Sequence, residues 1–243
     1  MKEILILGAS SDIAKAIANV YANNGYNIQL AGRNIEELQK DAKNLELRYR
    51  IRSTSHYFDA LDFNNHKTFY EKLNPEPYCV ISVFGYMPSQ QEAQNNFDEA
   101  HKIIDTNYTG NVSILNIVAN SFEKRESGII IGISSCAGDR GRKSNYIYGS
   151  SKGAFALYLS GLRHRLQESN VQVITVKPGF VATKMTESLD LPEKLTASPD
   201  EVAKDIYNAQ IKKKDIIYTK WFWWGIMFII KNIPEIVFKR TNL

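Results

Sequence analysis

Short apolar runs alternate along the chain with longer stretches in which apolar residues recur every three or four positions. The short runs have the composition of β-strands and lie at residues 4–7, 27–31, 53–58, 78–84, 128–134, 171–177 and 215–218. The longer stretches have the period of amphipathic helices, and clear examples lie at residues 12–24, 35–47 and 154–167. The alternation predicts an α/β chain with a doubly wound, Rossmann-type parallel sheet of about seven strands and helices on both faces.

The domain organisation follows from a lack of internal boundaries. No repeat, low-complexity stretch or linker rich in Pro, Gly or Ser divides the 243 residues, and α/β folds of this size commonly form one unit. Residues 221–238 are far richer in aromatic and aliphatic side chains than the rest. We therefore expect one Rossmann-type domain over residues 1–219 and a separate apolar C-terminal segment over residues 220–243.

The composition excludes several classes of protein. A hydrophobic fraction of 44% and a charged fraction of 23% are typical of globular proteins, so a packed core is expected. The net charge of +4 is modest, and no basic block suggests a nucleic-acid groove. The two cysteines and four scattered histidines lack ligand spacing, so we expect neither a disulfide framework nor a metal site. The apolar run at 4–7 is too short for a signal peptide, which predicts a cytoplasmic protein.

The first predicted strand runs into a turn of small residues at positions 8–14 (GASSDIA), after which a helix begins. Such a turn lets backbone amides and the positive end of a helix dipole face a pyrophosphate. The same residues also occur in ordinary strand-to-helix loops. If the turn binds a dinucleotide, we expect contacts from Gly8, Ser10, Ser11, Asp12 and Ile13.

Arg33 follows the second predicted strand, where enzymes that prefer NAD usually carry an acidic residue for the ribose 2′-hydroxyl. A guanidinium is suited instead to a 2′-phosphate, so the sequence favours NADP(H) as the cofactor. The alternative is that Arg33 is simply a solvated residue at the start of a helix.

Ser135, Tyr148 and Lys152 form the most specific pattern in the chain. Tyr148 comes thirteen residues after Ser135, and Lys152 lies four residues further on, which places both on one face of a helix. Together with the upstream turn and the downstream Pro178-Gly179, this spacing resembles the short-chain dehydrogenase/reductase family over roughly residues 3–218. The resemblance implies a Rossmann fold, a nicotinamide cofactor and a homo-oligomer.

The resemblance also implies a role for each site residue. Tyr148 would exchange the proton, with its pKa lowered by the ammonium group of Lys152, which would also hold the nicotinamide ribose. Ser135 would bind the substrate oxygen, and Asn107 would hold a water chain that leads to the lysine. Further cofactor contacts are implied for Asp59, Pro178, Gly179, Val181 and Thr183. Tyr146 is not expected to act, since Ser150 and not a lysine stands four residues after it.

Two departures from the family pattern stand out. Asp12 and Ala14 occupy positions that are glycines in the family's turn, and a carboxylate facing a diphosphate would repel it. We therefore expect Asp12 to point away and to cap the helix. Residues 82–85 (SVFG) replace the usual Asn-Asn-Ala-Gly, a change that is similar to the branch containing decaprenylphosphoryl keto-pentose reductases.

Residues 221–230 (WFWWGIMFII) are apolar throughout, but this is about half of the ~20 residues that a membrane-spanning helix requires. Tryptophans prefer the membrane–water boundary and nearby cations favour anionic headgroups, here Lys220, Lys231, Lys239 and Arg240. We expect residues 221–238 to lie peripherally on the inner face of the membrane. The alternative is packing against the domain or a partner subunit. Arg140, Arg142 and Lys143 are either a site for a substrate phosphate or a solvated loop.

Three functions remain open. The first is an NADPH-dependent reductase that converts a ketone to a secondary alcohol on a lipid-linked substrate, such as a polyprenyl-phosphate keto-sugar in cell-envelope synthesis. The second is a reductase of fatty-acyl, sterol or other hydrophobic carbonyls. The third is an NADP-binding scaffold without activity, although a pure binder needs no proton donor.

Overall fold

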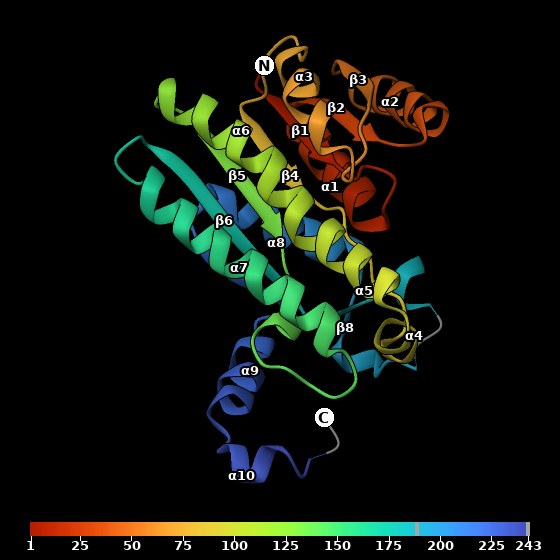
Figure 1. Cartoon of the computed structure of the whole chain (residues 1–243). Coiled ribbons are helices and arrows are strands. Elements are labelled where there is room, and N and C mark those ends of the chain that lie inside the picture. Colours follow the sequence, from red (N-terminus) through yellow and green to blue (C-terminus); the bar gives the residue numbers. More distant parts are fainter. Residues whose placement is uncertain (188–189, 242–243) are drawn as a thin grey trace.

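The computed structural model describes residues 1–187 and 190–241 of the chain. Its centre is a seven-stranded sheet in the order β3-β2-β1-β4-β5-β6-β9, in which every neighbouring pair is parallel (Figure 1). The strands are β1 Glu3–Leu7, β2 Asn27–Gly32, β3 Ser53–Tyr57, β4 Cys79–Ser82, β5 Gly128–Ile133, β6 Val171–Pro178 and β9 Ile216–Thr219. A second, two-stranded sheet pairs β7 Phe180–Val181 with β8 Thr196–Ala197.

Helices cover both faces of the large sheet and follow the strands in sequence (Figure 1). The α-helices are α1 Asp12–Asn23, α2 Ile35–Tyr49, α3 His66–Glu71, α4 Gln90–Asn95, α5 Phe97–Ile104, α6 Gly110–Lys124, α7 Tyr146–Leu166, α8 Pro199–Ile211, α9 Phe222–Asn232 and α10 Glu235–Phe238. A π-helical turn at Asp105–Thr109 joins α5 to α6. Short 3-10 turns lie at Phe63–Asn65, Cys136–Gly138, Lys184–Thr186 and Glu193–Leu195.

The sheet separates two apolar cores. One lies beneath α1, α2 and α8 and includes Ile17, Leu38 and Ile206. The other lies beneath α6 and α7 and includes Leu115, Phe122 and Phe155. Strands covered by helices on both faces are apolar on both faces, which explains why β5 is apolar along its whole length and β1 from Ile4 onward.

The direction of winding reverses between β1 and β4. The chain builds β2 and β3 on one side of β1, then returns to place β4, β5, β6 and β9 on the other side. In such sheets ligands bind outside the carboxyl ends of the strands, in the crevice at this reversal. The nucleotide turn after β1 and the residues after β4 and β5 meet at this edge.

The predicted fold class is confirmed, and each of the seven predicted strands is present close to its expected bounds. The predicted helix 154–167 begins earlier, at Tyr146. Glycines and serines at positions 149–153 obscure its apolar period, although tertiary packing buries Gly149, Ser151 and Lys152.

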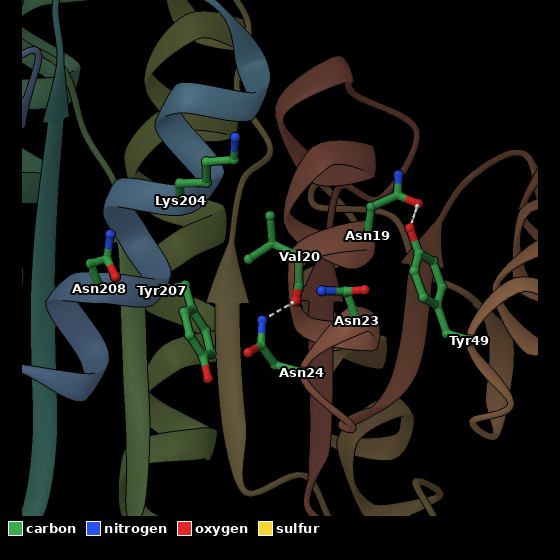
Figure 2. A pocket seen from close by; sticks show the side chains of 8 residues that line it. All are labelled: Asn19, Val20, Asn23, Asn24, Tyr49, Lys204, Tyr207 and Asn208. Carbon is green, nitrogen blue, oxygen red and sulfur yellow. Dashed lines mark hydrogen bonds between the residues drawn. The ribbon is translucent and has the colours of Figure 1, made fainter.

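A groove of about 320 Å³ lies between α1 and α8 (Figure 2). It is lined mainly by amide and phenol side chains, namely Asn19, Val20, Asn23, Asn24, Tyr49, Lys204, Tyr207 and Asn208. None of the residues predicted to bind cofactor or substrate belongs to this lining. The chemistry that the sequence predicts therefore lies elsewhere, at the carboxyl edge of the sheet.

Candidate active site

The nucleotide turn begins at Gly8, which has a φ of 82°, in the left-handed region that glycine tolerates without strain. This conformation directs the amides of Gly8 and Ala9 to the carbonyl oxygen of Ala31 at the end of β2, at 2.9 and 3.0 Å. Ser10, Ser11 and Ile13 are all partly exposed. The turn therefore presents its backbone at the carboxyl edge, in front of the first turn of α1.

Ser11, and not Asp12, caps α1. The Ser11 hydroxyl accepts a hydrogen bond from the amide of Ala14 at 3.2 Å. The Asp12 carboxylate accepts from the backbone amide of Lys184 at 2.9 Å, and so reaches across to the segment after β7. The expected role of Asp12 as a cap is wrong, because the preceding serine already has the extended backbone that a cap requires.

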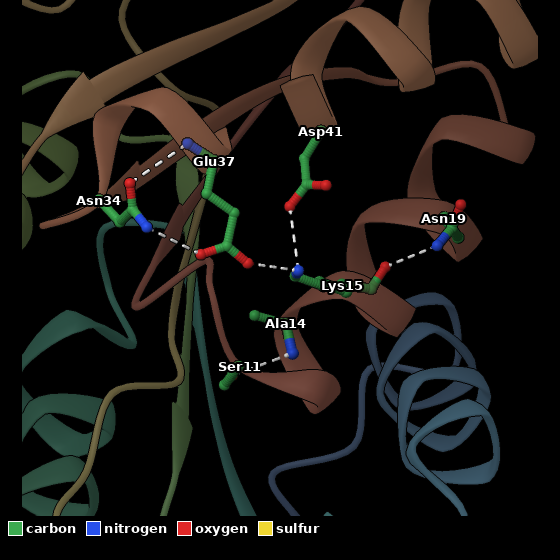
Figure 3. Close-up of polar contacts among 7 residues, drawn as sticks. All are labelled: Ser11, Ala14, Lys15, Asn19, Asn34, Glu37 and Asp41. Atoms are coloured by element: carbon green, nitrogen blue, oxygen red, sulfur yellow. Dashed lines mark hydrogen bonds and ion pairs between the residues drawn. The ribbon is translucent and has the colours of Figure 1, made fainter. Parts of the chain in front are cut away.

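Arg33 is exposed directly after β2 and makes no hydrogen bond or ion pair with the residues that the structure describes. Two acidic side chains of α2 are paired with one lysine, since Lys15 contacts Glu37 at 2.7 Å and Asp41 at 3.3 Å (Figure 3). This hydrogen bond with Lys15 lowers the pKa of Glu37. Asn34 caps α2 and also donates to Glu37, which fixes the start of that helix beside Arg33.

Asp59 follows β3 and lies in a tight turn at the same edge of the sheet. Its carboxylate accepts a hydrogen bond from the amide of Leu61 at 3.0 Å, and its carbonyl oxygen is 3.0 Å from Nε2 of the buried His66. Burial lowers the pKa of His66, which favours a neutral ring. The turn that carries Asp59 is thus rigidly attached to α3.

The loop after β5 and the start of α7 bring together Ser135, Tyr148 and Lys152. The side chain of Ser135 lies close enough to Tyr148 to lower its pKa, and Nζ of Lys152 lies 5.9 Å from the centre of the Tyr148 ring. Nζ donates to the carbonyl oxygen of Ile133 at 3.0 Å, and the hydroxyl of Ser134 donates to the carbonyl of Lys152 at 2.8 Å. Two contacts therefore hold the β5 loop against α7.

Burial shifts the pKa values of both ionisable groups toward the neutral form. It raises the pKa of Tyr148 to about 12, a shift that the hydrogen bond with Ser135 partly opposes. It lowers the pKa of Lys152 from 10.5 to about 8. Desolvation of the phenolate is the largest effect on the pKa of Tyr148 and raises it, so the expected net lowering is not seen in this structure. Tyr148 consequently keeps its proton at neutral pH.

Asn107 lies fully buried in the π-helical turn, a distortion that is frequent at functional sites. Its side chain accepts a hydrogen bond from the amide of Tyr86 at 2.8 Å and donates to the Tyr86 carbonyl and to the hydroxyl of Ser151 at 2.9 and 3.1 Å. Gly85 lies between Asn107 and Lys152, and both side chains approach it closely. Asn107 therefore anchors the chain after β4 to α7 beside Lys152.

Sequence reasoning missed the polar residues that support Asn107. The hydroxyl of Ser82 donates to the side chain of Asn111 at 2.5 Å, and Asn111 donates to the carbonyl oxygen of Asn107 at 3.0 Å. Ser82 and Asn111 are both buried. The altered 82–85 sequence was the available indication, because a buried serine at the end of a strand requires a polar partner.

The residues after β6 complete the edge. Pro178 ends β6, Val181 is buried in β7, and Thr183 begins a 3-10 turn with its backbone amide 3.2 Å from the hydroxyl of Thr186. Because β6 pairs with β5, this turn lies beside the loop that carries Ser135. The amide of Ser134 in fact donates to the carbonyl of Val176 at 2.8 Å.

The family model for short chain dehydrogenases matches residues 2–194. The chain belongs to the short-chain dehydrogenase family. An uncharacterized oxidoreductase of Mycobacterium tuberculosis is 29% identical over 240 residues, which cover 98% of this chain and 96% of that protein. An uncharacterized oxidoreductase of Streptomyces coelicolor is 28% identical over 246 residues, which cover 98% and 95%. This short-chain dehydrogenase is accordingly an oxidoreductase.

Solved structures share the fold of this short-chain dehydrogenase. A short-chain dehydrogenase from Sphingobium yanoikuyae in complex with NADPH superposes with a TM-score of 0.85 at 20% identity and covers 97% of each chain. An alcohol dehydrogenase from Thermococcus sibiricus complexed with 5-hydroxy-NADP has a TM-score of 0.79 at 22% identity, covering 97% of this chain and 99% of the other. A 7beta-hydroxysteroid dehydrogenase has a TM-score of 0.86 at 18% identity, covering 99% and 96%.

The residues at the carboxyl edge fit the nicotinamide dinucleotide that the family uses. The first-turn amides of α1 have no intrahelical acceptors and face the edge. The ammonium group of Lys152 can donate three hydrogen bonds and donates one to the carbonyl of Ile133, so it can bind further oxygens. The polar face of this edge therefore runs from Arg33, past the α1 turn, to Lys152.

Arg140, in the loop between Ser135 and Tyr148, is neither a free phosphate site nor a solvated side chain. Arg140 donates to the carbonyl oxygens of Ile230 and Ile233, each at 2.6 Å, and its guanidinium lies 3.7 Å from the centre of the Phe238 ring. Only 14% of its side chain is exposed, because the C-terminal segment covers it. Arg142 is partly buried beside Cys136, whereas Lys143 is exposed.

The C-terminal segment, which lies beyond the range of the family model, has two different faces. Its inner face, formed by Trp223, Met227 and Ile230, is buried together with Cys136. Its outer face is exposed and consists of Trp221, Trp224, Phe228, Ile229, Ile236 and Val237. None of the described helices is long and apolar enough to cross a membrane. The segment thus packs against the domain and still presents an apolar surface.

Proposed function

We propose that this short-chain dehydrogenase is an NADPH-dependent reductase that converts a ketone to a secondary alcohol. The gathering of Tyr148 and Ser135 beside the buried ammonium group of Lys152, whose Nζ lies 5.9 Å from the Tyr148 ring centre, is the observation that carries the proposal. This arrangement provides an acid, a partner for the carbonyl oxygen and a positive charge within one site. A protein that only binds a nucleotide has no use for the acid.

When bound, NADPH supplies the hydride that reaches the carbonyl carbon. Ser135 and Tyr148 would both hydrogen-bond the carbonyl oxygen and orient the ketone. Tyr148 would release its proton to that oxygen as negative charge develops there. The positive charge of Lys152 would stabilise the resulting phenolate, and Asn107 would keep the backbone around Lys152 in place.

The preference for NADPH over NADH is inferred from the surroundings of Arg33. An exposed guanidinium with no partner among the described residues is available for a 2′-phosphate. Glu37, a carboxylate in the first turn of α2, is bound by Lys15 (Figure 3). The structural relatives that hold NADPH and 5-hydroxy-NADP are in keeping with this proposal.

We further propose that the ketone is carried on a large apolar molecule. The leading candidate is a polyprenyl-phosphate keto-sugar, and a fatty-acyl, sterol or similar hydrophobic carbonyl is the second candidate. The exposed apolar face of the C-terminal segment, whose inner face packs against Cys136 next to Ser135, supports both. The C-terminal segment already binds Arg140, so a substrate phosphate would need another cation.

NADPH oxidation with purified protein tests the activity and the substrate together. A polyprenyl-phosphate keto-pentose, a 3-ketoacyl thioester and a ketosteroid would be compared, each with wild-type protein and with Tyr148→Phe. We expect turnover of one substrate by wild type, loss of turnover in Tyr148→Phe, and nearly unchanged NADPH affinity in that variant. Full activity of Tyr148→Phe would refute the catalytic assignment. Tight NADPH binding with no turnover of any carbonyl would favour the scaffold.

We also propose that the outer face of the C-terminal segment docks on the anionic inner face of the membrane. Trp221 and Trp224 are 84% and 62% exposed, and Lys231, Lys239 and Arg240 are exposed beside them. Interfacial helices combine an apolar face with cations in this way. Docking would bring the catalytic edge close to a lipid-borne substrate.

Sedimentation with liposomes tests the docking. The variant Trp224→Ser/Phe228→Ser/Ile229→Ser should lose binding to vesicles containing phosphatidylserine, while Leu47→Ser/Leu157→Ser, which removes exposed apolar side chains elsewhere, should keep it. A chain truncated after Thr219 should behave like the first variant. Equal binding by all of these proteins would refute docking through this face. The homo-oligomer implied by the family stays a prediction for light scattering.

A further inference from the structure

The inner face of the C-terminal segment forms a third small core that touches both loops of the candidate active site. Trp223, Met227 and Ile230 are buried with Cys136, the residue after Ser135. Phe180 and Leu195, from the stretch that follows β6, pack against the same cluster. The segment is therefore built into the reaction end of the sheet, and is not merely attached to its surface.

Trp223 makes the closest contact between this segment and the turn after β6. Its indole lies so near Gly179 that a Cβ at position 179 would come within 2.0 Å of Nε1 and Cε2. Gly179 does not have a positive φ, so the requirement for glycine here is one of space and not of backbone conformation. The indole N–H donates to the carbonyl of Leu195 at 3.2 Å, and the ring is perpendicular to Phe180 at 5.3 Å.

Three contacts fix the indole, and only 4% of the Trp223 residue is exposed. A ring held in this way limits the positions that the Pro178–Gly179–Phe180 backbone can take. That backbone lies on the β4-β5-β6 side of the reversal in the sheet, next to the loop of Ser135. Arg33 and the α2 N-terminus, in contrast, lie on the β2 side. The indole is thus placed to affect one half of a dinucleotide and not the other.

We propose that Trp223 is a positioning residue that sets the affinity for the nicotinamide half of the cofactor by holding the turn after β6. The proposal rests on the cofactor proposed above. It assigns the C-terminal segment a role in cofactor binding that does not depend on membrane docking, because the inner and outer faces carry separate side chains.

Calorimetric titration with two ligands tests the proposal. NADPH contains both halves, whereas adenosine 2′,5′-bisphosphate contains the adenosine and 2′-phosphate without nicotinamide. Trp223→Ala should raise the Kd for NADPH about tenfold or more and leave the Kd for the bisphosphate within about twofold. Trp224→Ala, an exposed indole one residue further on, is the matched control and should change neither value.

A double-mutant cycle makes the test specific to the Gly179 contact. Gly179→Ala places a methyl group against the indole and should weaken NADPH binding by about tenfold on its own. In a Trp223→Ala background the space is open, so adding Gly179→Ala should cost little more. Trp223→Phe keeps an aromatic ring but no N–H donor and should fall between wild type and Trp223→Ala. If Trp223→Ala does not fold, Gly179→Ala and Trp223→Phe still measure the coupling through their own NADPH and bisphosphate affinities.

Equal weakening of both ligands, or unchanged NADPH affinity in Trp223→Ala and Trp223→Phe, would overturn the proposal. So would a Gly179→Ala effect of the same size with and without the indole. If wild-type protein binds no NADPH, the proposed cofactor fails instead. The two failures are thus distinguished by the first titration.

Discussion

The guanidinium group of Arg140 lies 2.6 Å from the carbonyl oxygen of Ile233, so the loop after Ser135 and the C-terminal segment are bonded directly to each other. Arg140 also contacts Ile230, Glu235 and Phe238. The adjacent residue, Asp139, accepts hydrogen bonds from Lys177 and Tyr218 at 2.5 Å each. Consecutive side chains of one loop therefore hold the tail and the ends of β6 and β9.

Arg140→Ala should loosen the C-terminal segment. The change removes charge-assisted hydrogen bonds to the last carbonyls of α9, and we expect the free energy of unfolding to fall by about 2–3 kcal/mol. Tryptic cleavage at Lys231 and Lys239 should become faster under native conditions. Arg140→Lys should rescue little, because an ammonium group cannot reproduce the planar donor geometry. Lys43→Ala, which changes an exposed side chain, is the control. An equal loss of stability in that variant would contradict a specific role for Arg140.

Asp139→Asn should destabilise the protein more than an exposed charge change does. Lys177 would keep a buried ammonium group without its carboxylate, since the two side chains are only 13% and 4% exposed. Breaking one partner of a buried pair typically costs ~3–5 kcal/mol. Urea denaturation measures the effect, and the double variant Asp139→Asn/Lys177→Met should recover part of it. Wild-type stability of the single variant would show that the pair contributes nothing.

The pH dependence of ketone reduction should follow Lys152. Its pKa of about 8 means that the ammonium form dominates below that pH and is lost above it. The pKa of Tyr148 at about 12 keeps the phenol protonated throughout. We therefore expect kcat/KM for NADPH to be level from pH 6 to ~7.5 and to decline above ~8. Lys152→Arg stays charged and should lose the decline even if its rate is low; a decline at the same pH in that variant would exclude Lys152 as the cause.

Lys152→Met should raise the stability of the protein at neutral pH while abolishing turnover. A lysine whose folded pKa is lowered binds its proton more weakly when folded, so below pH 8 the native state carries the full cost of a buried charge. Removing the lysine relieves that cost. The gain in Tm should be largest at pH 7 and should shrink as the pH rises from 8 to 10.5. Over that range Lys152 is neutral in the folded wild type, so the cost of burying its charge disappears. A destabilised variant at pH 7 would contradict this reasoning.

Arg33→Ala should reduce the preference for NADPH over NADH. The variant removes a charge-assisted contact to the 2′-phosphate, for which we expect about a tenfold increase in KM for NADPH and little change for NADH. Lys43→Ala is the control, because Lys43 lies on α2 and has no proposed contact with the cofactor. It should leave the KM for NADPH and the KM for NADH unchanged. Unaltered kinetics in Arg33→Ala would mean that other groups select the cofactor.

The sequence alone determined the fold class and named the candidate catalytic residues, and the reason is local. A strand buried on both faces must be apolar, and a helix brings residues four positions apart onto one face, so β5 and the pair Tyr148 and Lys152 are readable without coordinates. The family match confirms that interpretation at the level of an oxidoreductase. The spacing of Ser135 alone did not show how its side chain lies relative to Tyr148.

Only the tertiary structure decided the rest, because those contacts join residues far apart in the chain. Arg140 binds Ile233, which lies 93 positions away in the sequence, and Trp223 packs against Gly179, which lies 44 positions away. Neither arginine nor tryptophan predicts such a partner by its residue type. Burial likewise set the pKa values of Tyr148 and Lys152, since desolvation depends on everything packed around a group. A sequence pattern records which residues can do chemistry, whereas the packing of distant segments determines their surroundings.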